Sequence, residues 1–273
     1  MLWTGMSHCQ PPFQLACSAE LSNDGSYLLQ SETNQSGTQI AISQSNHSIQ
    51  LLSADAAGQS LRLTATLGAR GGQRSSMHTA RISDIQFSPS NPNILLSCGE
   101  DKLVCLWDTR SGQRAAGGWR VTAEAAALAV GATGRAVAVA TEAPVNSSDD
   151  APIISLWDLT AGKLVRQYED FHSDSVSKLR WHPLKTRMLC SASEDGLLCA
   201  IDAANPDPDD ALQWCCNVDT PIRTFDFFGP QAQCASILTC NEGLQLCRLG
   251  EDVLQASCKV APTRRGSPAL HLT

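Results

Sequence analysis

One pattern of residues occurs twice in this chain with the same internal spacing. The first copy, HTARISDIQFSPSNPNILLSCGEDKLVCLWD, begins at His78, and the second, HSDSVSKLRWHPLKTRMLCSASEDGLLCAID, begins at His172. Each landmark therefore returns 94 positions later (172 − 78 = 94), with nothing inserted or lost between landmarks. So strict a spacing indicates that one supersecondary unit is used repeatedly, which predicts a repeat protein. Repeat proteins commonly present extended binding surfaces.

Weaker copies divide the chain into five units. Trp157-Asp158 repeats Trp107-Asp108 after 50 residues (157 − 107 = 50), and the flanking copies keep the apolar run and the turn but lose the Trp. The predicted units are 20–67, 78–119, 121–168, 172–214 and 217–250. We therefore expect one domain over 20–258, preceded by a segment at 1–19 and followed by a tail at 259–273. The tail has no strand pattern and is predicted to be disordered.

Apolar residues within each unit alternate with polar ones or form short β-branched runs bounded by turn residues, which is typical of strands. In the second unit this pattern predicts strands near 82–87, 93–98 and 103–107. Gly-Glu-Asp-Lys is a tight turn between the last two, because Asp favours turns by bonding nearby backbone amides. No stretch of the sequence has a sustained helical period. The predicted fold class is all-β.

These residues resemble a WD-repeat β-propeller over roughly residues 20–250, chiefly through the two Trp-Asp dipeptides with a His and a turn Asp at constant distance. The resemblance implies four-stranded blades, each tied by a loop His, a hydroxyl residue, the turn Asp and the Trp. It assigns this structural role to His78, Asp101, Trp107, Trp157, His172, Ser193 and Asp195. Gly99 stands at the expected hydroxyl position of the second unit, and Ile201 at the Trp position of the fourth. The blades are therefore predicted to be held mainly by apolar packing.

The chain length bears on the number of blades. Propellers have about four to eight blades, and seven blades of about 45 residues would need roughly 315 residues. The chain has 273 residues. We expect five visible blades of a seven-bladed propeller whose last blades are missing, with a closed five-bladed ring as the alternative.

Composition argues against several classes of function. Twelve cysteines lie at scattered strand positions, without a Cys-x-x-Cys pair, so neither a disulfide framework nor a metal site is predicted. No cofactor motif is present. The net charge of −7 and pI of 5.3 disfavour direct nucleic-acid binding, and no run of residues suits a membrane span. We expect a cytoplasmic and/or nuclear protein.

A catalytic role for His78 with Asp101 is the alternative to a structural one. The same pair returns as His172 with Asp195 in the fourth unit. Because an active site would not be duplicated in this way, the structural role is favoured, and the chain is predicted not to be an enzyme.

The resemblance also implies where partners bind: beside the first apolar residue of each inner strand, and before the turn Asp. The corresponding positions are Arg81, Ser83, Glu100, Ser175, Ser177, Glu194, Arg223 and Asn241. Their mixture of Arg and Glu favours a protein or peptide ligand that carries both charge signs. The predicted function is a non-catalytic interaction scaffold.

A narrower alternative is a substrate receptor of a cullin-4 ubiquitin ligase. Trp107-Asp108-Thr109-Arg110 resembles the Trp-Asp-x-Arg end of the blade motif through which such propellers dock the ligase adaptor. This resemblance assigns docking to Trp107, Asp108 and Arg110. Pairing of Arg110 with a neighbouring carboxylate is the competing interpretation.

Overall fold

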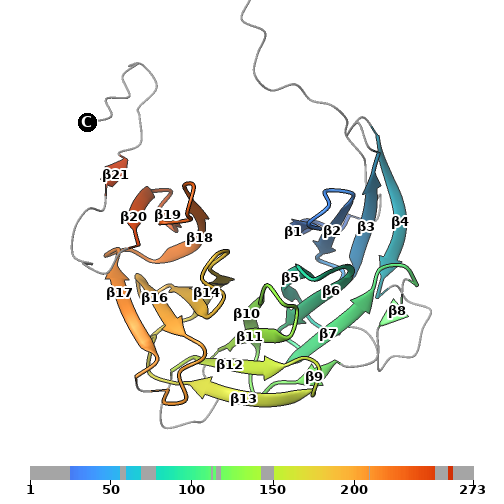
Figure 1. Cartoon of the computed structure of the whole chain (residues 1–273). Helices are drawn as coiled ribbons and strands as arrows, with labels where there is room; N and C mark the ends of the chain where they lie inside the picture. The colour runs from blue at the N-terminus through green and yellow to red at the C-terminus, as the bar shows by residue number, and fades with distance from the viewer. Residues whose placement is uncertain are drawn as a thin grey trace, which may run out of the picture.

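The computed structural model describes residues 25–55, 60–68, 78–111, 113–114, 118–142, 151–208, 210–249 and 258–260. Its strands form five antiparallel sheets, and each sheet is built from strands that follow one another in sequence. Figure 1 shows the five sheets as blades arranged around a common centre. The all-β prediction is confirmed, and the arrangement is that of a β-propeller with five blades.

The first three blades span the N-terminal half of the described chain. The first comprises β1 (Leu28–Thr33), β2 (Gln39–Gln44), β3 (Ile49–Ala54) and β4 (Leu61–Leu67). The second comprises β5 (Ile82–Ser88), β6 (Asn91–Gly99), β7 (Leu103–Asp108), β8 (Gln113–Arg114) and β9 (Trp119–Arg120). The third comprises β10 (Ala125–Val130), β11 (Ala136–Thr141), β12 (Ile153–Asp158) and β13 (Lys163–Tyr168).

The last two blades complete the set. The fourth comprises β14 (Val176–Trp181), β15 (Met188–Ser193), β16 (Leu197–Asp202) and β17 (Leu212–Asn217). The fifth comprises β18 (Ile222–Phe228), β19 (Cys234–Thr239), β20 (Leu244–Arg248) and β21 (Cys258–Val260). The first strand of each blade is innermost, and β1, β5, β10, β14 and β18 contact one another in that order. The strands predicted for the second unit agree with β5, β6 and β7.

Two boundaries differ from the sequence prediction. β17 continues to Asn217, past the expected end of the fourth unit at 214, and β21 pairs with β20 across the expected boundary at 258. The reason is that the outermost strand needs only one pairing neighbour and therefore carries a weaker apolar pattern. The segment 1–19, the tail beyond 260, and the acidic pair at 149–150 lie outside the described residues.

An apolar cluster fills each of the four interfaces between successive blades. For example, Ile49 and Leu51 of the first blade pack with Phe87, Leu95 and Trp107 of the second. Equivalent clusters join the second blade to the third, the third to the fourth, and the fourth to the fifth. Stability is therefore distributed over nearest-neighbour interfaces, as in other repeat proteins.

Cysteines contribute to these interfaces as small apolar side chains, as their strand positions suggest. Cys98, Cys105, Cys190 and Cys199 are all buried. The nine cysteines whose side chains the structure describes are free thiols. No helix among the described residues is long and apolar enough to cross a membrane.

Candidate functional site

A buried hydrogen-bonded set ties together two strands of the second blade, the turn between them and the loop before the blade. His78 Nδ1 lies 3.1 and 3.0 Å from the two carboxylate oxygens of Asp101, and His78 Nε2 lies 2.7 Å from Ser97 Oγ. Trp107 Nε1 donates to the same Ser97 oxygen over 2.8 Å. Asp101 also accepts from the backbone amide of Leu103, which fixes the β6–β7 turn. The set is therefore complete in this blade.

The hydroxyl position predicted from the sequence was wrong by two residues. Ser97 in the second blade and Ser191 in the fourth hold the His side chains, in place of Gly99 and Ser193. Ser193 instead donates to the carbonyl of Asp174 and accepts from the amide of Asp195. Side chains two residues apart on a strand share one face, so the sequence pattern alone did not separate the two positions.

The fourth blade keeps the His, Ser and Asp of this set and lacks only the Trp. His172 Nδ1 lies 3.0 Å from Asp195, and Nε2 lies 2.7 Å from Ser191. Ile201, fully buried, occupies the place of the Trp. The expectation that neither set is complete is therefore wrong for the second blade, whereas the fourth blade lacks only the Trp. That apolar packing is the main stabilising contribution stays a prediction.

The Trp of the third blade has a different environment. Trp157 Nε1 donates to Ser155 on its own strand over 2.9 Å. Its ring is tilted against that of Trp119, which belongs to the second blade, with 5.3 Å between the ring centroids. The position equivalent to Ser97 is Val139, an apolar residue that is fully buried. Trp157 therefore contributes an aromatic contact between blades.

The two copies of the His–Asp pair differ in charge. Burial is the largest single effect on His78 and opposes its charge, but the hydrogen bonds and charges of Asp101 and Cys105 together outweigh burial and raise the pKa of His78 to about 9. Burial is also the largest single effect at Asp101, but the hydrogen bond and charge of His78, with two backbone amides, together lower the pKa of that carboxyl group. At His172 burial prevails and lowers the pKa. Two contacts differ between the copies: Asp101 approaches His78 with both oxygens whereas Asp195 approaches His172 with one, and Cys105 favours the charge on His78 whereas no cysteine does so at His172.

The His, Ser and Asp groups contact one another as they would in a hydrolase, but a substrate has no access to them. Ser97 has no exposed surface and His78 is 4% exposed. Trp107 already donates to the hydroxyl oxygen that would act as nucleophile. A nucleophile must reach the substrate within hydrogen-bond distance, so this arrangement supports a structural role.

One end of the propeller gathers the residues at which the resemblance implies partner binding. In each blade the residue after the second strand donates its amide to the carbonyl just before the inner strand, as in Glu100 to Arg81 (3.0 Å) and Glu194 to Ser175 (2.9 Å). Arg81 and Glu100 are exposed and lie 4.0 Å apart. Ser83 and Ser177 lie half-buried on the inner strands. We call this end of the propeller the loop face.

The same backbone bond locates positions that the sequence reading missed. Glu142 donates its amide to the carbonyl of Glu124, which places both in the third blade at the positions of Glu100 and Arg81. In the fifth blade the amide of Cys240 donates to Pro221, so Cys240 is the counterpart of Glu100. Assigning Asn241 to that role was wrong, because its side chain contacts Thr239 within the turn. Counting from the turn residue failed where the turn lacks an Asp.

Arg223, the remaining predicted binding residue, lies on β18 at the position of Ser83 and is exposed. Ser175 Oγ donates to Glu142 of the neighbouring blade over 2.6 Å. The loop face therefore carries four glutamates on the second, third and fourth blades, with arginines at its two sides. The four are Glu100, Glu124, Glu142 and Glu194.

An ion pair in the centre of the propeller also escaped the sequence reading. Lys178 Nζ lies 2.9 and 3.0 Å from the two oxygens of Asp84, and the carboxylate accepts the amide of Leu128 from the blade between them. Asp84, Ala127 and Lys178 occupy equivalent positions, each just after the bulge of its inner strand. The small side chain of Ala127 lets Lys178 reach across the third blade.

Further charged groups surround this pair. Arg180 donates to the carbonyl of Phe225 over 2.9 Å and lies 3.6 Å from Asp226. Burial raises the pKa of Glu32 although Lys178 and Arg180 act in the opposite direction. Charged side chains on the inner strands of the first, fourth and fifth blades, Glu32, Arg180 and Asp226, therefore interact with one another or with Lys178. The sequence signal that could have predicted the Asp84–Lys178 pair is the opposite charge of two residues at equivalent repeat positions (178 − 84 = 94).

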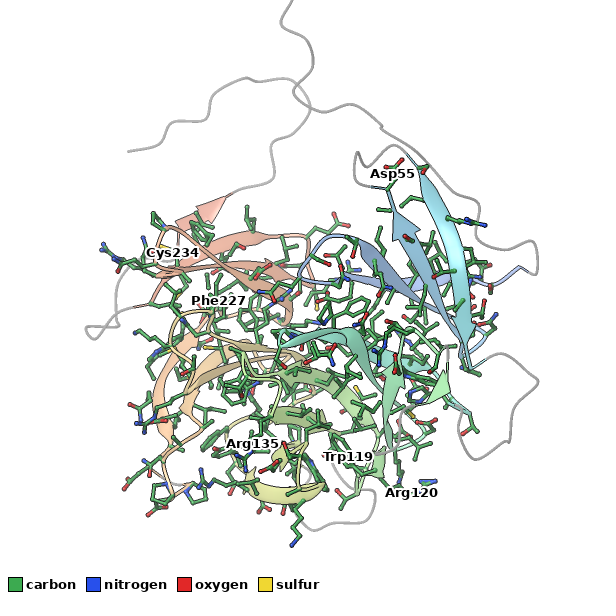
Figure 2. All side chains as sticks on the ribbon, turned by 45° about the vertical axis from the view of Figure 1, so that its right-hand side comes forward. Asp55, Trp119, Arg120, Arg135, Phe227 and Cys234 are labelled. Carbon is green, nitrogen blue, oxygen red and sulfur yellow. The ribbon has the colours of Figure 1, made fainter. Side chains whose placement is uncertain are left out.

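The opposite end of the propeller carries three Arg–Asp pairs at the ends of third strands. Arg110 Nε and Nη2 donate to the carboxylate of Asp108 over 3.1 and 2.8 Å. Arg187 makes the same forked contact with Asp202 in the fourth blade. Arg135, labelled in Figure 2, binds Asp158 in the third. Trp107 is 3% exposed and cannot contact an adaptor, so its assignment to docking was wrong.

The comparisons with known proteins agree with this architecture. The family described as WD domain, G-beta repeat matches residues 73–108 and 162–202, the two stretches that end at Asp108 and Asp202. WD40 repeats are thus present in these two stretches. These matches cover the first three strands of the second blade and of the fourth, the two blades that contain the buried His–Ser–Asp contacts. The third blade resembles them in topology and retains only the Trp-Asp end.

Several curated proteins are similar to parts of this WD-repeat chain. The WD repeat-containing protein 89 homolog of Dictyostelium discoideum is 29% identical over 61% of this chain and 43% of its own length. The WD repeat-containing protein GTS1 of Arabidopsis thaliana is 29% identical over 56% of this chain and 38% of its length. The GATOR2 complex protein Wdr59 of Drosophila melanogaster is 26% identical over 47% of this chain. The chain spans less than half the length of these relatives.

Metal-binding chemistry has little support in the part of the chain described by the structure. There, no three His, Cys, Asp or Glu side chains gather in a way that could hold a metal ion. The predicted absence of cofactors remains a prediction.

Proposed function

We propose that this WD-repeat propeller is a non-catalytic protein-interaction scaffold that binds a segment of a partner protein on its loop face. The observation that carries this proposal is the convergence of polar side chains from several blades. Arg81, Glu124, Glu194 and Arg223 are exposed and stand at the inner-strand entries or adjoining turns of four successive blades. The relative named as a GATOR2 complex protein is consistent with a role in protein assemblies.

The charges of the loop face favour a particular ligand. Arg81 is partly neutralised by Glu100, and Glu142 accepts a hydrogen bond from Ser175. Glu124 on the third blade and Glu194 on the fourth add further negative charge to the loop face. Complementary charge steers association and fixes register, so the preferred partner segment carries Lys or Arg opposite the third and fourth blades, with an acidic group toward Arg223.

Charge reversal on the loop face tests the scaffold proposal. Partners captured by the wild-type chain are identified by mass spectrometry, and the affinity of the chief one is measured. The double substitution Glu124→Lys and Glu194→Lys is expected to weaken binding more than about tenfold, because like charges placed opposite each other at an interface are strongly unfavourable. The chain should remain folded, since both side chains are exposed.

The matched control reverses a charge at the opposite end. Arg187→Glu, in the exposed pair with Asp202, should leave binding unchanged. Equal losses in the control and the double variant would contradict a binding site on the loop face. Unchanged binding in the double variant would do the same.

The receptor alternative remains a prediction, and the contacts of Arg110 give it no added support. Asp108 already accepts from Nε and Nη2 along one edge of the Arg110 guanidinium, and Asp202 does the same for Arg187. The contact therefore recurs in a blade to which no docking role is assigned. Arg110→Ala should leave the thermal midpoint unchanged, because exposed ion pairs contribute little to stability. Co-purification of the cullin-4 adaptor with wild-type chain, and its loss with Arg110→Ala, would establish the alternative. Absence of the adaptor from wild-type material would refute it.

A further inference from the structure

β17 in the fourth blade carries two adjacent cysteines whose side chains project to opposite faces of the sheet, as neighbours on a strand do. Cys215 pairs in register with Cys199 of β16, and their sulfur atoms are 3.2 Å apart. Cys216 projects toward the fifth blade, where its sulfur lies 3.6 Å from that of Cys247 on β20. One strand thus places a thiol pair on each side of the blade.

The pair formed by Cys216 and Cys247 lies at the interface between two blades. Cys247 is part of the apolar cluster that joins the fourth and fifth blades, and Cys216 packs against that cluster with Trp214. Cys216 is half-buried, whereas Cys247 is 7% exposed. A small reagent can therefore reach Cys216 first, with Cys247 behind it.

The more accessible thiol, that of Cys216, is also the more acidic of the two. The hydrogen bond that Cys247 donates to Cys216 lowers the pKa of Cys216 to about 7 and, with burial, raises the pKa of Cys247. The thiolate is the reactive form of cysteine, so Cys216 is the nucleophile of the pair. Disulfide bonds have an S–S length of about 2.05 Å, so the sulfur atoms need to approach each other by about 1.5 Å from their present 3.6 Å.

We propose that Cys216 and Cys247 form an oxidation site at which a small disulfide, such as oxidised glutathione, converts the two thiols into a disulfide between the fourth and fifth blades. The only reactants are the two protein thiols and the small disulfide.

The reaction proceeds by two thiol–disulfide exchanges. The Cys216 thiolate attacks one sulfur of oxidised glutathione, a mixed disulfide forms, and one glutathione thiolate leaves. Cys247 then loses its proton to solvent and attacks the Cys216 sulfur, and the second glutathione thiolate leaves. Two protein thiols are oxidised and one glutathione disulfide is reduced to two glutathione thiols, so electrons and protons balance.

The bond would connect strands that are joined in the reduced chain by apolar contacts and the hydrogen bond between the two thiols at this point. A cross-link between residues 216 and 247 closes a loop of chain and removes entropy from the unfolded state. The oxidised chain should therefore have a higher thermal midpoint than the reduced chain, and the fifth blade should resist limited proteolysis longer.

Peptide mapping of the whole chain tests the proposal. The chain is incubated with oxidised glutathione, remaining thiols are alkylated, and a digest is analysed without reductant. We expect a peptide pair that links Cys216 to Cys247, reversed by dithiothreitol, whose mass is lower by two hydrogen atoms than the sum of the two reduced peptides. Persistent glutathione on Cys216, or a link from Cys216 to Cys215 or to Cys234, would overturn the proposal.

Two substitutions sharpen this test. Cys216→Ser should abolish the link and the rise in thermal midpoint. Cys240→Ser, which changes an exposed thiol in the loop after β19, is the matched control and should preserve both. If Cys216→Ser folds poorly, the mapping of the wild-type chain still decides the outcome, because it identifies the linked residues directly.

Discussion

Trp107→Ala is expected to lower the free energy of unfolding by about 3–5 kcal/mol, the range found when a large buried aromatic side chain is truncated. Trp107 is 3% exposed, packs in the cluster between the first and second blades, and donates to Ser97. A domain is commonly stable by only about 5–15 kcal/mol. Urea denaturation followed by circular dichroism would measure the loss.

The fourth blade supplies a matched variant for this experiment. Ile201 occupies the Trp position there, and the contacts of His172 with Ser191 and Asp195 persist. Trp107→Ile should therefore destabilise the chain less than Trp107→Ala, because the larger side chain fills more of the cavity. An unchanged unfolding midpoint for Trp107→Ala would show that the second blade does not depend on this anchor.

Lys178→Met is expected to destabilise the chain by about 3–5 kcal/mol, because it leaves the Asp84 carboxylate buried without its partner. The Asp84 side chain is 3% exposed and that of Lys178 21%. Removing the charge of Asp84 as well, in Asp84→Asn with Lys178→Met, should recover much of the loss, since Asn can still accept the amide of Leu128. A double-mutant cycle measures this coupling.

The control for the buried pair is the exposed pair at the other end of the propeller. Arg187→Met removes a partner from Asp202, where solvent screens the charge, and little change in stability is expected. If Lys178→Met has an equally small effect, the ion pair does not fasten the second blade to the fourth.

The fold class and the strands of the second unit could be predicted because they depend on local pattern. Ile85 and Phe87 alternate with polar residues and fix which face of a strand is apolar, and the Gly-Glu-Asp-Lys turn fixes where the next strand begins. The 94-residue spacing also made His78 and Asp101 equivalent to His172 and Asp195. Contacts between equivalent residues in two copies are expected to agree, and they do so at the His–Ser bonds of 2.7 Å.

The candidate site was only partly predictable. Arg81, Glu100 and Glu194 were found by register, whereas Glu124 and Glu142 were missed because the third unit lacks the turn Asp from which the count began. Asn241 was misplaced for the same reason. A backbone bond, from the amide after β11 to the carbonyl before β10, aligned these positions without reference to side chains.

The sequence by itself therefore determined the strands, their repetition and the pairing of His with the turn Asp. Tertiary structure alone decided that Ser97 and not Gly99 meets His78, that Lys178 crosses Ala127 to reach Asp84, and that Cys216 meets Cys247. Residues two apart on a strand share a face, so alternation cannot choose between them. Which side chains meet across blades depends on twist, on the bulge in each inner strand and on the volume of the residues between them, and none of these is a local property of the sequence.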